Sequence, residues 1–277
     1  MKLEADVLFE QAVETLIHDI HAQYGYDFSG YARASVYRRI KRFLGNKNLA
    51  SVEELRKSLF QDPYFFENFL QEITVNVTEM FRDPTFFLAL REKVLPILST
   101  YPFIKIWDAG CSTGEELFSL AILLKEEGLL ERTKIYATDI NQKVLKQAKE
   151  GIFNLANMAS YTSAYYAAGG KTEFSSYYTS SYGSAKFDAS LVKNAVFYPH
   201  NLATDSSFNE FHLILCRNVL IYFNRELQER VFNLFDESLV SLGYLGLGKK
   251  ETLAMSQIHN SYTCIDKSNR IYRKTTR

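Results

Sequence analysis

The sequence is poor in cysteine, and its few cysteines are scattered. Cys111, Cys216 and Cys264 are odd in number and form no CxxC pair. This spacing argues against a disulfide framework and against a zinc site built on cysteine. We therefore expect a reducing compartment and no bound metal.

The sequence also lacks a net charge and a long apolar segment. Lysine plus arginine and aspartate plus glutamate each total 32, so no overall field draws the chain to nucleic acid or to an anionic membrane. No run of 18 apolar residues occurs, and Glu4 and Asp6 stand where a signal peptide needs basic and then apolar residues. These absences predict a cytoplasmic protein with no nucleic-acid partner and no membrane insertion.

What the sequence does have is enough apolar residues for a substantial core, 47% of 277. Up to about residue 90 their spacing is helical, as at Ile40 and Phe43. Gly45-Asn46 is expected to end that helix, and Ser51-Val-Glu-Glu54 is typical of a capping box that opens the next. We predict an all-helical N-terminal domain over residues 1–85.

From residue 103 onward, short apolar runs alternate with helical periods. This alternation predicts an α/β domain over residues 86–277 with a doubly wound, mostly parallel sheet. Lys267-Ser-Asn269 separates the last two runs and suits a hairpin, so one edge of the sheet is expected to be antiparallel. The expected strands cover residues 103–106, 134–137, 195–198, 211–215 and 244–247, with hairpin strands at 262–266 and 270–273.

An insertion lies between the helix that ends near Glu150 and the apolar run at Ala195. It is too long for an ordinary loop, and between residues 151 and 185 its only charged residues are Lys171 and Glu173. One interpretation is a small β-subdomain at about residues 172–201, with strands near 175–179, 185–189 and 196–200. The other is a tyrosine-rich loop packed on the sheet.

The segment Trp107-Asp-Ala-Gly-Cys-Ser-Thr-Gly-Glu-Glu116 predicts a strand, a glycine turn and a helix. Gly110 and Gly114 permit a sharp turn and let backbone N–H groups approach a ligand. Asp139 ends the next apolar run, which is where nucleotide-binding sheets place the acidic residue that holds ribose hydroxyls. We expect a small ligand at this edge of the sheet.

Phosphate is a poor candidate for that ligand. No Gly-Lys-Ser or Gly-Lys-Thr follows the turn, and its two glycines stand four apart, unlike those of a dinucleotide fingerprint. Glu115 and Glu116 at the start of the helix would repel a pyrophosphate. A ligand with a positive centre and no phosphate fits better, and S-adenosylmethionine has both properties.

Three further segments stand beside this site in the predicted topology. Asn76-Val-Thr-Glu-Met-Phe-Arg-Asp-Pro84 precedes the sheet domain, while His200-Asn-Leu202 and Cys216-Arg-Asn-Val-Leu-Ile-Tyr-Phe223 each follow a strand. Strand carboxyl ends are where open α/β sheets bind ligands.

Together these segments give the chain a resemblance, over essentially its whole length, to the CheR family of chemoreceptor glutamate methyltransferases. The matching segments are Asn76-Val-Thr, Phe81-Arg-Asp, Ala109-Gly-Cys-Ser-Thr-Gly-Glu-Glu116, Ala137-Thr-Asp-Ile140, Asn201-Leu202, Cys216 to Phe223, and Gly243-Tyr-Leu-x-Leu-Gly248 with Glu251. The chain departs from the family pattern at Met80, Asp108, Leu117-Phe118 and Lys249-Lys250. Those departures leave the shape of the substrate entrance open.

The resemblance implies a helical N-terminal domain, a class I methyltransferase domain that binds S-adenosylmethionine and releases S-adenosylhomocysteine, and an inserted β-subdomain. It makes Glu116, with Glu115 as the near alternative, and Asp139 ligands for polar groups of the cofactor. Arg82 and Tyr222 would lie nearest the transferred methyl group as catalytic residues. The further cofactor contacts that it implies are Asn76, Thr78, Arg82, Gly110, Asn201, Leu202, Arg217 and Asn218.

The implied reaction forms methyl esters on glutamate side chains of a chemoreceptor. The basic helix that carries Arg33, Arg38, Arg39, Lys41 and Arg42 would dock on the receptor, together with the β-subdomain, although these residues alone could equally form a solvated face. The alternative to an enzyme is a non-catalytic module that binds the cofactor and docks on a signalling partner.

Overall fold

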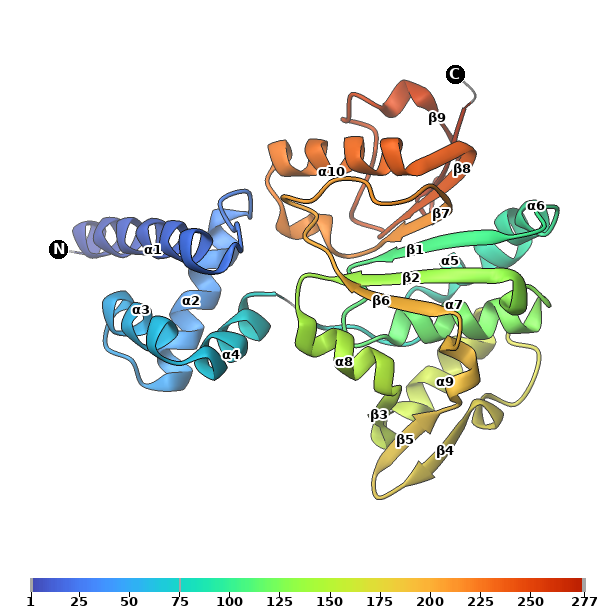
Figure 1. Ribbon diagram of the computed structural model, residues 1–277, viewed down its shortest axis with the longest axis horizontal. Coiled ribbons are helices and arrows are strands. Elements are labelled where there is room, and N and C mark those ends of the chain that lie inside the picture. The colour runs from blue at the N-terminus through green and yellow to red at the C-terminus, as the bar shows by residue number, and fades with distance from the viewer. Residues whose placement is uncertain (1, 75, 276–277) are drawn as a thin grey trace. The chain divides into compact units, whose positions relative to one another are not determined.

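The computed structural model describes residues 2–74 and 76–275 and divides into two compact units. The first unit comprises Met1–Asn76 with two later pieces of chain, Asn201–Asp205 and Tyr222–Val231. The second unit comprises Val77–His200, Ser206–Ile221 and Phe232–Arg277. Figure 1 labels the helices and strands of both units.

Helices build the N-terminal part of the first unit: α1 (Lys2–Tyr24), α2 (Arg33–Lys47), α3 (Val52–Gln61) and α4 (Pro63–Ile73). Their apolar faces meet in one core that includes Leu16, Ile40 and Phe69. The hydroxyl of Ser51 accepts a hydrogen bond from the N–H of Glu54 at 3.1 Å, which caps α3 as its sequence predicts.

The end of α2 differs from the prediction. The helix continues through Gly45 and Asn46 to Lys47, and it ends at Asn48, whose φ is +55°. Asparagine tolerates this left-handed conformation better than most residues do, so it can take the terminating role usually filled by glycine. The expected stop at Gly45-Asn46 was therefore two to three residues too early.

A seven-stranded sheet forms the centre of the second unit, in the order β6-β2-β1-β7-β8-β10-β9 (Figure 1). The first five strands of this order are parallel, and β10 and β9 complete the sheet as an antiparallel hairpin. This confirms the predicted doubly wound sheet and its antiparallel edge. The strands are β1 (Ile104–Ala109), β2 (Thr133–Asp139), β6 (Ala195–Pro199), β7 (Phe211–Cys216), β8 (Leu239–Leu247), β9 (Tyr262–Asp266) and β10 (Ile271–Lys274).

The strand order reverses beside β1. The chain runs from β1 to β2 and β6 on one side, and it later returns to place β7 and β8 on the other side. In open α/β sheets such a switch point, at the carboxyl ends of the strands, is where ligands bind. The topology therefore marks the carboxyl ends of β1, β2 and β7 as the candidate site.

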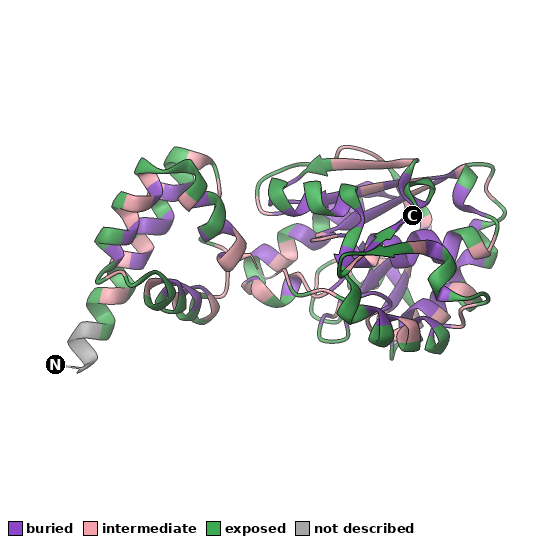
Figure 2. Cartoon of the chain, turned by 90° about the horizontal axis from the view of Figure 1, so that it is seen from below, coloured by how far each residue is buried: buried purple, intermediate pink, exposed green. Residues whose placement is uncertain are grey.

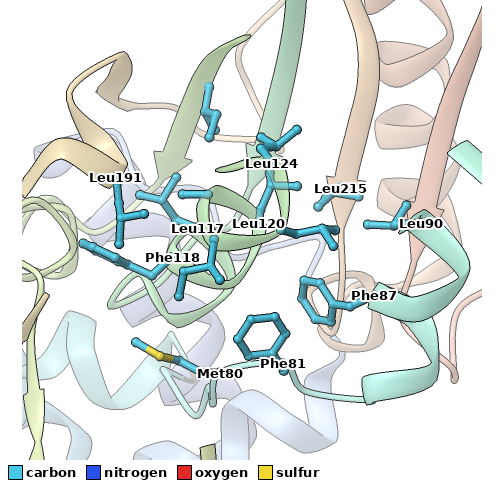
Figure 3. Packing of buried hydrophobic residues seen from close by; sticks show 14 of the residues in the cluster. Met80, Phe81, Phe87, Leu90, Leu117, Phe118, Leu120, Leu124, Leu191 and Leu215 are labelled. Carbon is cyan, nitrogen blue, oxygen red and sulfur yellow. The ribbon is translucent and has the colours of Figure 1, made fainter. Parts of the chain in front are cut away.

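Helices cover the sheet, and the core lies between them and the strands (Figures 2 and 3). Phe81, Phe87, Leu117 and Leu120 are fully buried there, with Leu215 of the sheet. The helices of this unit are α5 (Pro84–Ala89), α6 (Leu95–Leu98), α7 (Glu115–Glu126), α8 (Gln142–Glu150), α9 (Met158–Ala167) and α10 (Arg225–Ser238), the last of which begins in residues of the first unit. A π-helical turn, η1 (Leu90–Val94), joins α5 to α6.

The insertion carries a small antiparallel sheet in the order β3-β5-β4. Its strands are β3 (Ile152–Asn154), β4 (Tyr178–Ser181) and β5 (Ser184–Phe187). The expected third strand near residues 196–200 is wrong for this sheet, because Ala195–Pro199 pairs with β2 in the large sheet. The insertion also contains α9, which the sequence did not predict because its alanine, serine and tyrosine residues show little amphipathic pattern.

Short 3-10 turns complete the chain: η2 (Leu130–Arg132), η3 (Leu155–Asn157), η4 (Phe174–Tyr177), η5 (Ala189–Val192), η6 (Leu220–Tyr222) and η7 (His259–Ser261). Across the part of the chain that the structure describes, no helix has the length and apolar character that a membrane crossing requires. Within the same residues, no group of three or more histidine, cysteine or acidic side chains could hold a metal ion.

Candidate active site at the carboxyl ends of β1, β2 and β7

The glycine turn follows β1 directly and leads into α7. Gly110 and Gly114 have φ angles of +84° and +100°. A Cβ atom at Gly110 would lie 2.5 Å from a methyl carbon of Val219, and one at Gly114 would lie 2.9 Å from the Cα of Ala148. Both glycines are therefore required by close packing as well as by backbone conformation.

Three backbone N–H groups of this turn are bonded within the protein. Those of Gly110 and Cys111 donate to the carbonyl of Thr138 at 2.8 and 2.9 Å, and that of Gly114 donates to the carbonyl of Cys111 at 3.0 Å. These three groups are therefore used within the fold, and the approach of a ligand to the rest of the turn stays a prediction. Gly110 shapes the turn at the site, and its N–H is used to tie the turn to β2.

Asp139 ends β2 and holds the turn from the other side. Its carboxylate accepts hydrogen bonds from the N–H of Ser112 at 3.0 Å and the N–H of Asn141 at 2.9 Å. Burial raises the pKa of Asp139 to about 6, although the hydrogen bonds from Asn141 and Ser112 act in the opposite direction. Asp139, the residue predicted to bind the ribose hydroxyls, is thus a buried carboxylate that two backbone N–H groups already position.

Three buried polar atoms beside this turn have no hydrogen-bond partner among the described residues. They are Oδ2 of Asp108, the hydroxyl of Ser112 and Nδ2 of Asn141. Burial raises the pKa of Asp108 well above its usual range, the charge of Glu116 adds to that effect, and Arg217 opposes it. Because buried polar groups are almost always paired, these atoms fit a site that a polar ligand completes.

The two glutamates at the start of α7 differ in their surroundings. Glu115 is buried and accepts a hydrogen bond from the hydroxyl of Thr113 at 2.6 Å. Burial raises the pKa of Glu115, and the Thr113 hydroxyl opposes the rise. Glu116 is half-buried and forms an ion pair with Arg217. Both carboxylates are thus near the turn, but Glu116 already has a cationic partner.

Arg217, just beyond β7, is the buried cation of the site. Its side chain is 1% exposed and bonds Asp83 at 2.9 Å, the carbonyl of Arg82 at 2.8 Å and the carboxylate of Glu116. Its guanidinium also lies 4.1 Å from the ring centroid of Phe86. Two carboxylates neutralise this charge, so Arg217 joins β7, α7 and the segment before α5 into one polar cluster.

Arg82 and Thr78 lie in that segment before α5. Both are half-buried, and the guanidinium of Arg82 donates to the carbonyl of Val77 at 3.1 Å. Phe81 and Asp83, on either side of Arg82, have φ angles of +52° and +57°. Two non-glycine residues in this conformation mark a strained backbone of the kind that gathers at functional sites.

Glu251 is a site residue to which the sequence gave no role. It is buried, and its carboxylate accepts hydrogen bonds from the N–H groups of Asn218 at 3.1 Å, Leu220 at 2.8 Å and Gly248 at 2.6 Å. Asn218 itself has a φ of +62°. Glu251 therefore fixes the loop after β7, and no spacing around it in the sequence indicates this role.

The other predicted site residues belong to the first unit. The side chain of Asn76 donates to the carbonyl of Gln71 at 3.3 Å, and Leu202 is buried. The side chain of Asn201 accepts from the N–H of Ala203 at 3.0 Å, within a tight turn. Tyr222 is half-buried, and the guanidinium of Arg39 lies 4.7 Å from its ring centroid.

Arg39 corrects one prediction about the basic helix. It is only 7% exposed, and its guanidinium donates to the carbonyl of Ile73. Burial lowers the pKa of Arg39, and the neighbouring Tyr222 opposes that shift. Of the five basic residues expected to dock on a partner, Arg39 therefore cannot do so, whereas the other four are exposed on α2.

The strand order, the glycine turn after β1 and the buried acidic residue at the end of β2 define a class I methyltransferase fold. Two family models match the chain: the all-alpha domain of CheR methyltransferases over residues 11–74, and their SAM binding domain over residues 76–270. The chain belongs to the CheR methyltransferase family, and S-adenosylmethionine is its cofactor.

Two relatives match along nearly their whole length. A Pseudomonas putida protein, provisionally named methyltransferase Cher3, is 49% identical over 95% of this chain and 96% of its own. The chemotaxis protein methyltransferase of Listeria monocytogenes is 30% identical over 91% of both chains. Among solved structures, an O-methyltransferase domain of StiE shares 17% identity at a TM-score of 0.36, over 60% of this chain and 42% of that one, a similarity too low to add to the assignment.

Proposed function

We propose that this methyltransferase forms methyl esters on glutamate side chains of a chemoreceptor. The observation that carries the proposal is the end-to-end similarity to chemotaxis protein methyltransferases, 30% identity over 91% of the Listeria monocytogenes chain. The polar cluster at the strand ends supports it, because Asp139 is bonded to the glycine turn and Glu116 is paired with Arg217 just beyond β7.

The unpaired atoms at the glycine turn fit the cofactor. Its ammonium and ribose hydroxyls need acceptors, and Oδ2 of Asp108 and the carboxylate of Asp139 are buried acceptors at the carboxyl ends of β1 and β2. We propose that these two residues hold the cofactor, together with Ser112 and Asn141, which the sequence did not single out. The other predicted cofactor contacts stay predictions: Asn76, Thr78, Arg82, Gly110, Glu116 with Glu115 as its alternative, Asn201, Leu202, Arg217 and Asn218.

The proposed reaction needs no general acid or general base from the protein. When bound, S-adenosylmethionine supplies a methyl group on a positively charged sulfur. A glutamate side chain has a pKa of about 4.3, so it is ionised at neutral pH and needs no general base. What this chain must supply is alignment of the attacking oxygen and exclusion of water, and alignment of this kind lowers barriers by roughly 7–11 kcal/mol.

We propose Arg82 as the group that orients the substrate carboxylate, through the paired N–H donors of its guanidinium. Among the described contacts the guanidinium of Arg82 makes one hydrogen bond, to the carbonyl of Val77, so further N–H donors remain for a substrate. Tyr222 is the second proposed catalytic residue, and the resemblance alone supports it.

The substitution Arg82→Ala tests this role. We expect methyl transfer to fall by at least about 10²-fold, because a misplaced reactant loses the advantage of alignment, while the circular dichroism spectrum is retained. The matched control is Arg132→Ala, which removes a second arginine of the same unit that also donates to backbone carbonyls, those of Ser99 and Tyr101. Wild-type turnover in Arg82→Ala would contradict the assignment.

The reaction itself is tested with methyl-labelled S-adenosylmethionine and the purified cytoplasmic fragments of the chemoreceptors encoded in the same genome. A labelled fragment that releases methanol in mild base indicates carboxyl esters, since N-methyl groups stay attached. Base-stable label would instead identify another methyl acceptor. No label in any fragment, with tight S-adenosylhomocysteine binding, would favour the non-catalytic module.

The proposed docking surface for the receptor is the exposed face of α2. Arg38 is exposed there and has no ion pair among the described residues, while Arg33, Lys41 and Arg42 pair with Glu14, Asp6 and Glu72. Exposed pairs of this kind are worth only about 0–1 kcal/mol, so they can be exchanged for carboxylates of a partner. The β-subdomain remains a predicted second contact.

A further inference from the structure

Tyr222 and the two residues after it contact the loop before α2 at three points. The N–H of Ala32 donates to the carbonyl of Tyr222 at 2.8 Å, and the N–H of Asn224 donates to the carbonyl of Gly30 at 2.8 Å. Between them, Tyr31 and Phe223 form an antiparallel bridge, with ring centroids 5.0 Å apart. A short strand-like pairing therefore fixes the backbone at residues 222–224.

Close packing strengthens this attachment. A Cβ atom at Gly30 would lie 2.8 Å from a methyl carbon of Leu227, so Gly30 lets α10 approach the loop directly. Phe223 and Leu227 are both buried at 6% exposure. Backbone and apolar contacts thus hold the main chain at residues 222–227, but they do not fix the orientation of the Tyr222 ring.

Arg39 is the residue that contacts that ring. Its guanidinium carbon lies 4.7 Å from the ring centroid, and the same guanidinium donates to the carbonyl of Ile73 at the end of α4. Because the guanidinium is planar and anchored at one edge, its position relative to α2 and α4 is fixed. A cation in this place over a tyrosine ring stabilises one ring position.

We propose that Arg39 is a positioning residue for methyl transfer, acting through the ring of Tyr222. The proposal rests on the proposed function, since it takes Tyr222 to be catalytic. It gives the helical domain a part in turnover that is separate from partner docking: α2 presents Arg38 to solvent and turns Arg39 inward to Tyr222.

A double-mutant cycle on the full-length protein tests the inference, with the receptor fragments described above as substrates. We expect Arg39→Met to lower kcat by about 10- to 100-fold, as a small misplacement of a catalytic group does, with the receptor KM and the Kd for S-adenosylhomocysteine unchanged. Tyr222→Phe should lower kcat as well. The double variant should be no slower than Tyr222→Phe, because Arg39 would act only through that side chain; multiplied effects would overturn the inference.

The matched control is Arg56→Met. Arg56 belongs to the same unit and lies over an aromatic ring too, 5.5 Å from the centroid of Phe60, but it has no described contact with Tyr222. Its kcat should equal that of the wild type. If Arg39→Met does not fold, Arg39→Lys keeps the charge and loses the planar shape, and the same cycle with Tyr222→Phe applies.

The NMR signals of the Tyr222 ring separate failure of this inference from failure of the proposed function. Arg39→Met should shift these ring signals, because the cation over the ring is lost, and Arg56→Met should leave them unchanged. If the wild type esterifies no carboxylate but this shift is found, the proposed function fails and the contact between Arg39 and Tyr222 stands. Unchanged ring signals together with an unchanged kcat would overturn the positioning role.

Discussion

At the scale of single residues, Asp139 lies at the proposed cofactor site, and its ionisation at neutral pH lowers the free energy of unfolding. Burial raises its pKa from 3.8 to about 6, which means that the folded protein holds its proton to a higher pH than the unfolded chain does. The contribution of Asp139 to stability is therefore complete below about pH 4 and is lost as the pH rises through 6. A shift of this size corresponds to roughly 3 kcal/mol.

This shift gives a prediction for Asp139→Asn, which cannot titrate. Between pH 4 and pH 7, the variant should gain stability relative to the wild type by up to roughly 3 kcal/mol. Urea unfolding at unit steps of pH measures the difference. Asp188→Asn is the control of opposite sign, because the N–H and hydroxyl of Ser190 lower the pKa of Asp188. Stability curves for Asp139→Asn and the wild type that stay parallel would contradict the shift.

The sequence predicted which residues stand at the strand ends but not what each one contacts. The glycine turn and Asp139 follow from local spacing, whereas the pairing of Arg217 with Asp83 joins residues 134 positions apart. Contacts over such separations depend on the strand order. For the same reason the role of Glu251, which accepts from two loops, could not be found from its neighbours in sequence.

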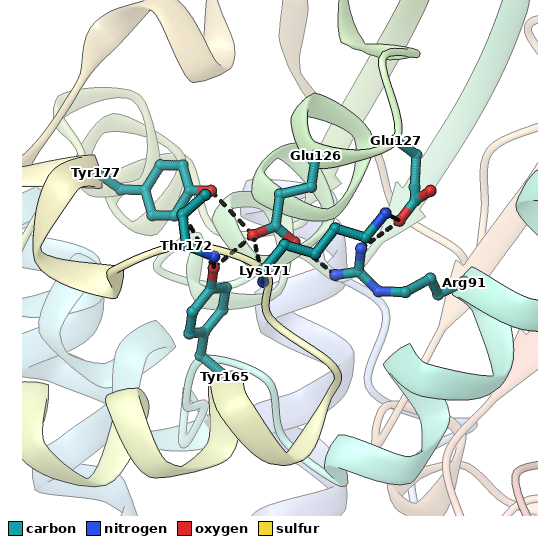
Figure 4. A network of polar contacts seen from close by, with 7 residues as sticks. All are labelled: Arg91, Glu126, Glu127, Tyr165, Lys171, Thr172 and Tyr177. Carbon is teal, nitrogen blue, oxygen red and sulfur yellow. Dashed lines mark hydrogen bonds and ion pairs between the residues drawn. The ribbon is translucent and has the colours of Figure 1, made fainter.

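At the scale of elements, one polar network ties the insertion to the rest of the second unit (Figure 4). Glu126, at the end of α7, accepts hydrogen bonds from Tyr165 of α9, from Tyr177 at 3.1 Å and from the N–H of Lys171 at 3.0 Å. Arg91, in the π-helical turn η1, completes the network, with its Nη2 atom 2.6 Å from Oε2 of Glu126. Burial alone would raise the pKa of Glu126, but these donors together lower it.

We therefore predict that Glu126→Gln destabilises the second unit by about 2–3 kcal/mol, because several donors lose a charged acceptor, while Arg91 keeps its ion pair with Glu127. The amide that replaces the carboxylate would also turn an N–H₂ group toward existing donors. Tyr177→Phe removes a single hydroxyl donor and should cost only about 1 kcal/mol. Denaturant unfolding and hydrogen exchange over residues 155–192 measure both effects; equal costs for the two substitutions would show that the carboxylate is not the centre of the network.

The same network explains why the sequence did not predict the helix and the strand boundaries of the insertion. The central strands of the large sheet followed from their apolar runs, since β1 and β7 are buried along almost their whole length. Tyr165 and Tyr177 are buried in the insertion through hydrogen bonds as well as ring contacts, so the segment has no clear apolar period. Its helix and its strand boundaries therefore depended on tertiary contacts that the sequence pattern does not show.

At the scale of the whole molecule, the charges balance to zero, so attraction to an acidic partner must be local. We predict that Arg38→Glu raises the KM for the receptor fragment several-fold and leaves the Kd for S-adenosylhomocysteine unchanged, with a smaller effect at high salt. Lys57→Glu on α3 makes the same change of charge at another exposed position of the helical unit. Equal effects of the two substitutions would indicate a general rather than a local field.

The first unit is assembled from three separate stretches of chain, and this limits how evolution can rearrange the family. A gene fragment ending near residue 76 would encode α1 to α4 but would omit Phe223 and Leu227, leaving Tyr31 and Gly30 without the surfaces they pack on. The helical domain is therefore a poor candidate for exchange between proteins as a simple N-terminal module. Its sequence and that of residues 222–227 are expected to change together in descent.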